Sequence, residues 1–301
     1  MRVPLLLGLI FCGSLLASMA SQPPSSTYLQ KEIDRVMASH PGAFVVVEIA
    51  SGKILAARNL QLAASRLESP GSTVKPFVLM ALLESGKLDP KQQLVCRRPL
   101  KIGNVEMDCT HPVQIAELDA SDAIAYSCNS YVSQVATRLN DSELVEVFRR
   151  AGFDSPSKLV AHEARGRIRL PSDSDSLRLE ALGYRGIEVT PLELLQAYRR
   201  LAIRRGSSGI DADASVFQGL ENSIAIGMAR TAGVDGMKMA GKTGTAPTRN
   251  AKYSHGFFAG FAPAEKPEIA FMVFLEQGRG ADAAAVAQPV LEAYARRRNT
   301  Q

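Results

Sequence analysis

Residues 256–275 read GFFAGFAPAEKPEIAFMVFL, two short apolar runs separated by a proline-bounded turn. Aromatic and β-branched residues in runs of this length, with Pro at the break, predict two neighbouring strands. A second pair of strands is predicted near the N-terminus, where Ala43–Ile49 and Ile54–Ala57 flank the turn Ser51-Gly52-Lys53. Between the two pairs, from about Pro70 to Ala232, the apolar positions follow helical spacing.

Strands at both ends of the chain with helices between them predict an α+β fold. The two pairs bury their apolar faces most economically in one antiparallel sheet built from both chain termini and flanked by the first and last helices. We expect residues 21–301 to form a single domain, with an α/β lobe of residues 27–66 and 236–301 and an all-helical lobe of residues 67–235. A functional site is expected at the seam between the two lobes.

The N-terminal segment has the composition of a secretory signal peptide. Arg2 is followed by an apolar run from Val3 to Leu16, and small residues lie three and one before a cleavage site after Ala20. Residues 1–20 are therefore expected to be removed and the rest of the chain exported. A retained membrane anchor formed by residues 3–20 is the alternative.

Composition and charge exclude several classes of protein. With 46% hydrophobic and 22% charged residues among 301, the chain is not expected to be disordered or collagen-like. Lys and Arg number 35 against 30 Asp and Glu, and the resulting charge of +5 is scattered along the chain. Because Trp is absent and aromatic residues make up only 6%, we do not expect nucleic-acid binding.

Three cysteines lie in the predicted mature chain. Cys96 and Cys109 bracket a predicted hairpin with Gly103-Asn104 near its middle, and export favours a Cys96–Cys109 disulfide at its ends. Two small buried hydrophobic residues are the alternative interpretation. His111 supplies at most a third metal ligand with no obvious fourth, so no metal site is predicted. Cys128 is left unpaired and is predicted to be a packing residue.

The first candidate for chemistry is Pro70-Gly71-Ser72-Thr73-Val74-Lys75, in which Pro-Gly breaks the chain and Ser72 begins a helix. The free backbone N–H groups there favour developing negative charge. Lys75 lies one turn further along the same face, so its amine can reach the Ser72 hydroxyl and act as a base if it is kept neutral. Ser-x-x-Lys occurs about once by chance in such a chain, and Ser155-Pro156-Ser157-Lys158 is a second copy. A capping serine and a surface lysine therefore remain the alternative.

Two further polar clusters follow in the sequence. Ser127-Cys128-Asn129 lies between two helical segments, where a hydroxyl and an amide can point into one cleft; ordinary turn chemistry is the alternative. Lys242-Thr243-Gly244-Thr245-Ala246 continues a strand predicted over Met237–Gly241. A substrate chain could lie along such a strand edge while the lysine attracts a carboxylate. A polar strand end before Pro247 is the alternative.

Taken together and in this order, the three motifs resemble those of the penicillin-binding protein transpeptidases, within the wider family of serine acyl-transferases and β-lactamases. The resemblance runs from about Ala43 to the C-terminus. The stretches that carry it are Ser69–Phe77, Ser127–Tyr131, Val189–Tyr198, Ala240–Ala246 and Gly256–Pro263.

The resemblance implies a role for each motif residue. Ser72 would be the acylated nucleophile and Lys75 its general base. Ser127 would relay a proton toward the leaving amine, and Lys242 would add positive potential that helps to keep Lys75 neutral. Backbone N–H groups of Ser72 and Thr245 would form the oxyanion hole. Substrate binding is implied for Asn129, Thr243, Gly244 and Thr245.

The implied substrate is a peptidoglycan stem peptide ending in D-Ala-D-Ala. Acylation would release D-Ala, and an amine or water would then resolve the acyl-enzyme as a transpeptidase or a carboxypeptidase does. β-Lactams would acylate the same serine, and no metal or organic cofactor is implied. The expected location is the periplasmic or extracellular side of a bacterial envelope, with cell-wall proteins as expected partners.

Two alternatives stay open within the same fold. A serine β-lactamase would need a deacylating glutamate, and the nearest candidates by order, Glu163 and Glu180, lie in no recognisable motif. A β-lactam sensor or cell-wall scaffold would keep the fold and become acylated without turnover.

Overall fold

The computed structural model describes residues 27–207, 211–248 and 252–300. The predicted signal peptide of residues 1–20 lies outside the described residues. Among the residues that are described, no helix is both long enough and apolar enough to cross a membrane.

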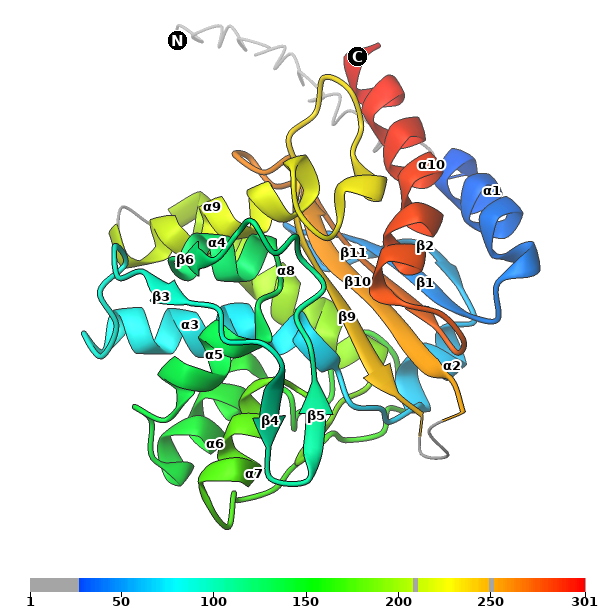
Figure 1. Ribbon diagram of the computed structural model, residues 1–301. Helices are drawn as coiled ribbons and strands as arrows, with labels where there is room; N and C mark the ends of the chain where they lie inside the picture. The colour runs from blue at the N-terminus through cyan, green and yellow to red at the C-terminus, as the bar shows by residue number, and fades with distance from the viewer. Residues whose placement is uncertain (1–26, 208–210, 249–251, 301) are drawn as a thin grey trace, which may run out of the picture.

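Both ends of the chain contribute to one five-stranded antiparallel sheet, which confirms the predicted α+β fold (Figure 1). The N-terminal hairpin joins the C-terminal strands through β1 and β11, which pair from Gly42 with Leu275 to Glu48 with Ile269. The strand order is β2 (Ile54–Arg58), β1 (Gly42–Glu48), β11 (Ile269–Leu275), β10 (Ser254–Ala262) and β9 (Ala240–Pro247). The strand predicted from Met237 begins only at Ala240, because a bridge between Val234 and Met237 closes a turn there.

The sheet separates two hydrophobic layers, because successive side chains of a strand point to opposite faces. Phe44 and Val46 of β1 face one layer, and Val45 and Val47 face the other. The first layer is covered by α1 (Thr27–Val36) and α10 (Gly280–Asn299), which lie side by side (Figure 1). The second is covered by α8 (Pro191–Ser207) and the remaining helices: α2 (Leu60–Ser65), α3 (Lys75–Glu84), α4 (Ala120–Ala125), α5 (Asn129–Ala136), α6 (Asp141–Ala151), α7 (Ser174–Ala181) and α9 (Asp211–Ala225).

The prediction of an all-helical lobe is wrong in detail, since three short two-stranded ribbons lie among these helices. Their strands have only two or three residues, too few to show a period of two in the sequence. The predicted turn at Gly103-Asn104 is confirmed. The ribbons are β3 (Leu94–Val95) with β6 (Glu117–Leu118), β4 (Leu100–Ile102) with β5 (Val105–Met107), and β7 (Arg167–Ile168) with β8 (Ile187–Glu188). The boundaries of the two lobes stay a prediction.

Helix α3 is buried on every side, and this decides the environment of the first motif. All residues from Lys75 to Leu83 are buried, as expected for a helix that is apolar all round. The helix continues from a 3-10 turn over Gly71–Val74, which contains Ser72. Lys75 is therefore the first residue of a helix that lies in the protein interior.

Candidate active site

The turn that carries Ser72 packs closely against the edge strand β9. A Cβ atom on Gly71 would lie 2.6 Å from the carbonyl oxygen of Thr245, and one on Gly244 would lie 2.4 Å from that of Pro70. Gly71 also has a φ of 57°, in the left-handed region that favours glycine. Both glycines are therefore needed to bring the first and third motifs into backbone contact.

We expect Gly244→Ala to lower the rate of acylation by a penicillin about a hundredfold, because a shift of about 1 Å in a reacting group has that effect. The added methyl group meets backbone atoms, so β9 or the Ser72 turn must move. The rate is measured by stopped-flow labelling. The control is Gly206→Ala on α8, where nothing lies within 4 Å of the added carbon. An unchanged rate in Gly244→Ala would show that the contact between turn and strand does not position the reacting group.

Two buried lysines meet at Ser127. The Lys75 Nζ donates hydrogen bonds to the Ser127 carbonyl at 2.9 Å and to the Asn129 Oδ1 at 2.6 Å, and it lies 3.5 Å from the Ser127 Oγ. The Lys242 Nζ donates to the same Oγ at 2.9 Å and to the carbonyl of Thr243 at 3.1 Å. The structure thus brings all three motifs together around one hydroxyl. Ser127 itself has a φ of 56°, an uncommon conformation for a residue with a side chain.

Burial changes the protonation of both lysines. Lys75 and Lys242 are 0% exposed, and loss of hydration disfavours their charged forms. Burial lowers the pKa of Lys75 from 10.5 to about 8, although the neighbouring Cys128 and Cys109 partly oppose the shift. Burial and then the positive charge of Lys75 lower the pKa of Lys242 well below its usual value. Two amines whose charged forms are both disfavoured, and which both contact one hydroxyl, are able to exchange a proton through it.

The other predicted site residues lie around this centre. Ser72 is half-buried one helical turn before Lys75, and its carbonyl accepts the Lys75 backbone N–H. Within the described residues its hydroxyl makes no hydrogen bond; such bonds often tighten only when substrate binds. The Asn129 amide donates to the Asp108 carbonyl at 3.1 Å in addition to its contact with Lys75. The exposed Thr245 accepts a hydrogen bond at its hydroxyl from the Gly280 N–H at 2.9 Å.

The cysteines differ from the sequence-based expectation. Cys96, Cys109 and Cys128 are free, so the predicted Cys96–Cys109 disulfide is absent from the structure. The Cys128 sulfur instead contacts both of the others, 3.5 Å from that of Cys96 and 3.7 Å from that of Cys109. The prediction that His111 has no fourth partner for a metal site is also wrong, because Cys128 completes a group of four ligand atoms. The folding of the second motif against the hairpin creates this group, and sequence spacing did not reveal it.

The two glutamates considered for deacylation have other contacts. Glu163 accepts hydrogen bonds from the Ser157 hydroxyl at 2.9 Å and the Val160 N–H at 3.1 Å, within its own loop. Glu180 on α7 is 1% exposed, and its Oε1 has no hydrogen-bond partner among the described residues. Burial, together with the charge of Asp141, raises the pKa of Glu180 from 4.5 to about 8.

We expect Glu180→Gln to stabilise the protein at pH 9 and to change its stability little at pH 5. The folded state holds the Glu180 proton more tightly than the unfolded state, so stability falls as pH rises from 4.5 to about 8. The amide has no charge to bury and avoids this loss. Urea unfolding at both pH values measures the difference, with the exposed Glu146→Gln as control. Equal effects of Glu180→Gln at both pH values would contradict the explanation.

The comparisons with known proteins agree with this arrangement. The family model of the penicillin binding protein transpeptidase domain matches residues 42–295. The chain belongs to the penicillin-binding protein transpeptidase family. Among its relatives, the peptidoglycan D,D-transpeptidase FtsI of Buchnera aphidicola subsp. Schizaphis graminum is 27% identical over 79% of this chain and 49% of its own length. FtsI of Escherichia coli K12 is 26% identical over 78% of this chain and 46% of its own length. The chain thus spans about half the length of these relatives.

Solved structures of the family share the fold. The structure of Pseudomonas aeruginosa PBP2 in complex with WCK 5153 has a TM-score of 0.76 at 23% identity. The match covers 89% of this chain and 74% of the PBP2 chain. The transpeptidase domain of Burkholderia pseudomallei penicillin-binding protein 3 has a TM-score of 0.78 at 20% identity. The match covers 91% of this chain and 93% of that domain's chain.

Proposed function

We propose that this chain is a peptidoglycan D,D-transpeptidase that works through an acyl-enzyme on Ser72. The observation that carries the proposal is the meeting of Lys75 and Lys242 at the Ser127 hydroxyl, beside the turn that holds Ser72. Such a centre can move a proton without water, and membership of the family supports the same chemistry.

In the first step, the Ser72 Oγ attacks the carbonyl carbon of the penultimate D-Ala in a stem peptide ending in D-Ala-D-Ala. Neutral Lys75 takes the serine proton, which passes through the Ser127 hydroxyl to the leaving amine. The C–N bond breaks, terminal D-Ala departs, and an ester on Ser72 remains. Backbone N–H groups of Ser72 and Thr245 stabilise the oxyanion, and loss of one such donor typically costs about 100- to 1000-fold.

Substrate is held along β9. Thr243 and Thr245 bind its carboxylate, with Gly244 leaving room between turn and strand, and Asn129 binds its amide. An amine from a second stem peptide then attacks the ester and forms the cross-link, whereas attack by water gives carboxypeptidase activity. Because peptidoglycan lies outside the cytoplasm, the protein works on the outer side of the bacterial membrane, where β-lactams acylate the same serine and other cell-wall proteins are its partners.

The test is to incubate the purified chain with a fluorescent penicillin and follow the adduct by intact mass. We expect one stable adduct per chain. In a separate incubation, unlabelled protein supplied with stem-peptide muropeptides should give cross-linked product and free D-Ala. Rapid loss of the adduct with hydrolysed drug would identify a β-lactamase instead. A stable adduct without release of D-Ala would identify a scaffold or sensor, and D-Ala release without cross-links a carboxypeptidase.

A further inference from the structure

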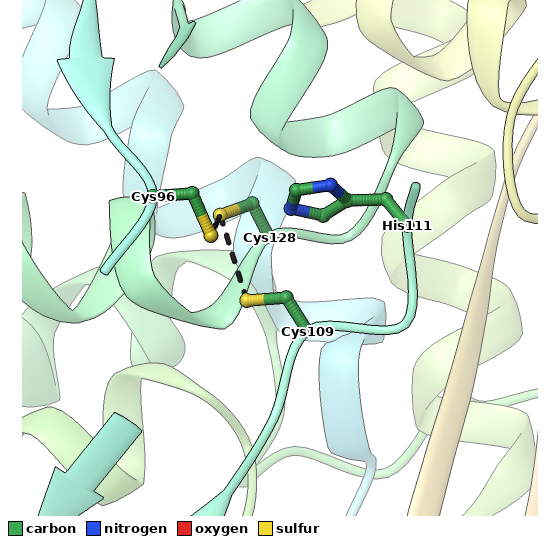
Figure 2. A group of neighbouring side chains, drawn as sticks. All are labelled: Cys96, Cys109, His111 and Cys128. Carbon is green, nitrogen blue, oxygen red and sulfur yellow. Dashed lines mark hydrogen bonds between the residues drawn. The ribbon is translucent and has the colours of Figure 1, made fainter. Parts of the chain in front are cut away.

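Four side chains that the proposed reaction does not use meet next to Ser127. Cys96 follows β3, Cys109 follows β5, His111 lies in the loop after Cys109, and Cys128 caps the N-terminus of α5. One ligand atom from each lies within 4.8 Å of all the others. Figure 2 shows the three sulfurs and the imidazole turned toward a common centre.

The spacing of the sulfurs fits a tetrahedral metal. Zinc with Zn–S bonds of about 2.3 Å separates its sulfur ligands by about 3.8 Å. The Cys128 sulfur lies 3.5 Å from that of Cys96 and 3.7 Å from that of Cys109. A disulfide would need about 2.05 Å, and three thiols in one cluster cannot all be paired with each other.

The Nε2 atom of His111 is placed to be the fourth ligand. His111 is 2% exposed, and its Nε2 is buried with no hydrogen-bond partner among the described residues. Its Nδ1 accepts a hydrogen bond from the Arg98 guanidinium at 2.6 Å and lies 3.1 Å from the Pro112 carbonyl. Because the Arg98 guanidinium can only donate, Nδ1 accepts in this structure and the ring proton lies on Nε2. Zinc binding at Nε2 moves this proton to Nδ1, which then donates to the Pro112 carbonyl, as metal-binding histidines commonly do. The Arg98 guanidinium has to turn away from Nδ1 in that state, while it keeps its 2.8 Å bond to the His111 carbonyl.

Backbone donors are arranged to stabilise thiolates. The N–H of Tyr131 donates to the Cys128 sulfur at 3.4 Å, and that of Ser130 donates to the Cys109 sulfur at 3.5 Å. Both N–H groups belong to the first turn of α5, where the helix dipole also favours negative charge. Three cysteines and one histidine are a common ligand set of closed, structural zinc sites.

We infer that Cys96, Cys109, His111 and Cys128 form a structural zinc site. Zinc displaces the thiol protons when it binds, and all four positions are filled by protein, so no place remains for a reacting water. The ion joins the β3–β6 and β4–β5 ribbons to the second motif. Because Cys128 stands between Ser127 and Asn129, the two residues that contact Lys75, the ion is a positioning element for the active site.

Metal analysis of the full chain tests the site. The protein is produced with added zinc, purified under reducing conditions without chelator, and analysed for zinc by plasma mass spectrometry. We expect about one zinc per chain, and at least a tenfold loss in Cys96→Ser and His111→Ala. The matched control is His162→Ala, since His162 is an exposed histidine outside the cluster. Cobalt added to the metal-free wild type should give the visible bands and thiolate charge transfer of a tetrahedral site, so the test does not depend on the variants folding.

Three results would overturn the inference: no bound zinc in protein whose three thiols are reduced, a disulfide among these sulfurs in zinc-supplied protein, or full zinc content in His111→Ala. Chelation should also lower the melting temperature and slow acylation by penicillin. The slower acylation rests on the proposed function, whereas zinc content and the cobalt spectrum do not. If the protein binds zinc but is never acylated by penicillin, the zinc site is confirmed and the proposed function is wrong.

Discussion

Ser72→Ala is expected to abolish covalent labelling by a fluorescent penicillin, since Ser72 is the proposed nucleophile of the acyl-enzyme. The hydroxyl lies one turn before a lysine that is 0% exposed, beside an edge strand carrying a second buried lysine. Without the oxygen nucleophile the remaining groups can bind the drug but cannot open its ring. Labelling is measured by gel fluorescence and by intact mass after denaturation.

Ser155→Ala is the matched control for this prediction, because Ser155 begins the second Ser-x-x-Lys sequence of the chain. Its lysine, Lys158, is exposed, whereas Lys75 is buried. We expect Ser155→Ala to be labelled as the wild type is. Labelling that survives in Ser72→Ala and disappears in Ser155→Ala would mean that the wrong serine has been assigned.

Lys75→Met is expected to slow acylation by about 100- to 10,000-fold, the usual contribution of a general base. Methionine fills a similar volume in the buried start of α3 without an amine, so the fold should be retained. The second-order rate constant for penicillin acylation measures the loss, and far-ultraviolet circular dichroism checks the fold. Lys158→Met, at the exposed lysine, should leave the rate unchanged. A rate in Lys75→Met within a factor of a few of the wild type would exclude Lys75 as the base.

The same lysine sets the expected pH dependence. Burial lowers the pKa of Lys75 to about 8, so the neutral, reactive form increases as pH rises toward that value. At pH 7 about a tenth of the molecules would hold a neutral Lys75, against about 1 in 3000 for a lysine of pKa 10.5. The acylation rate should therefore rise from pH 6 to about 8 and level off above it. A flat profile through this range would contradict the assignment.

The sequence alone predicted the overall architecture and identified the three motifs of the candidate site. Apolar runs such as 256–262 and 269–275 are dense enough to identify strands, and a sheet assembled from both termini is the simplest way to bury them. The order of Ser72, Ser127 and Lys242 in the chain predicted one site. The structure places all three motifs within reach of each other.

Only the tertiary structure decided the burial of the lysines, and with it their lowered pKa values, and the partners of the cysteines. Lys75 and Lys158 both end a Ser-x-x-Lys sequence, but Lys75 is buried at the start of α3 and Lys158 is exposed in a loop. Cys96 and Cys128 are 32 residues apart, so no local period relates them, and they meet because the β3 ribbon packs on the start of α5. Local patterns follow from backbone geometry and hydrophobic spacing, whereas desolvation and ligand grouping depend on which distant segments become neighbours in the fold.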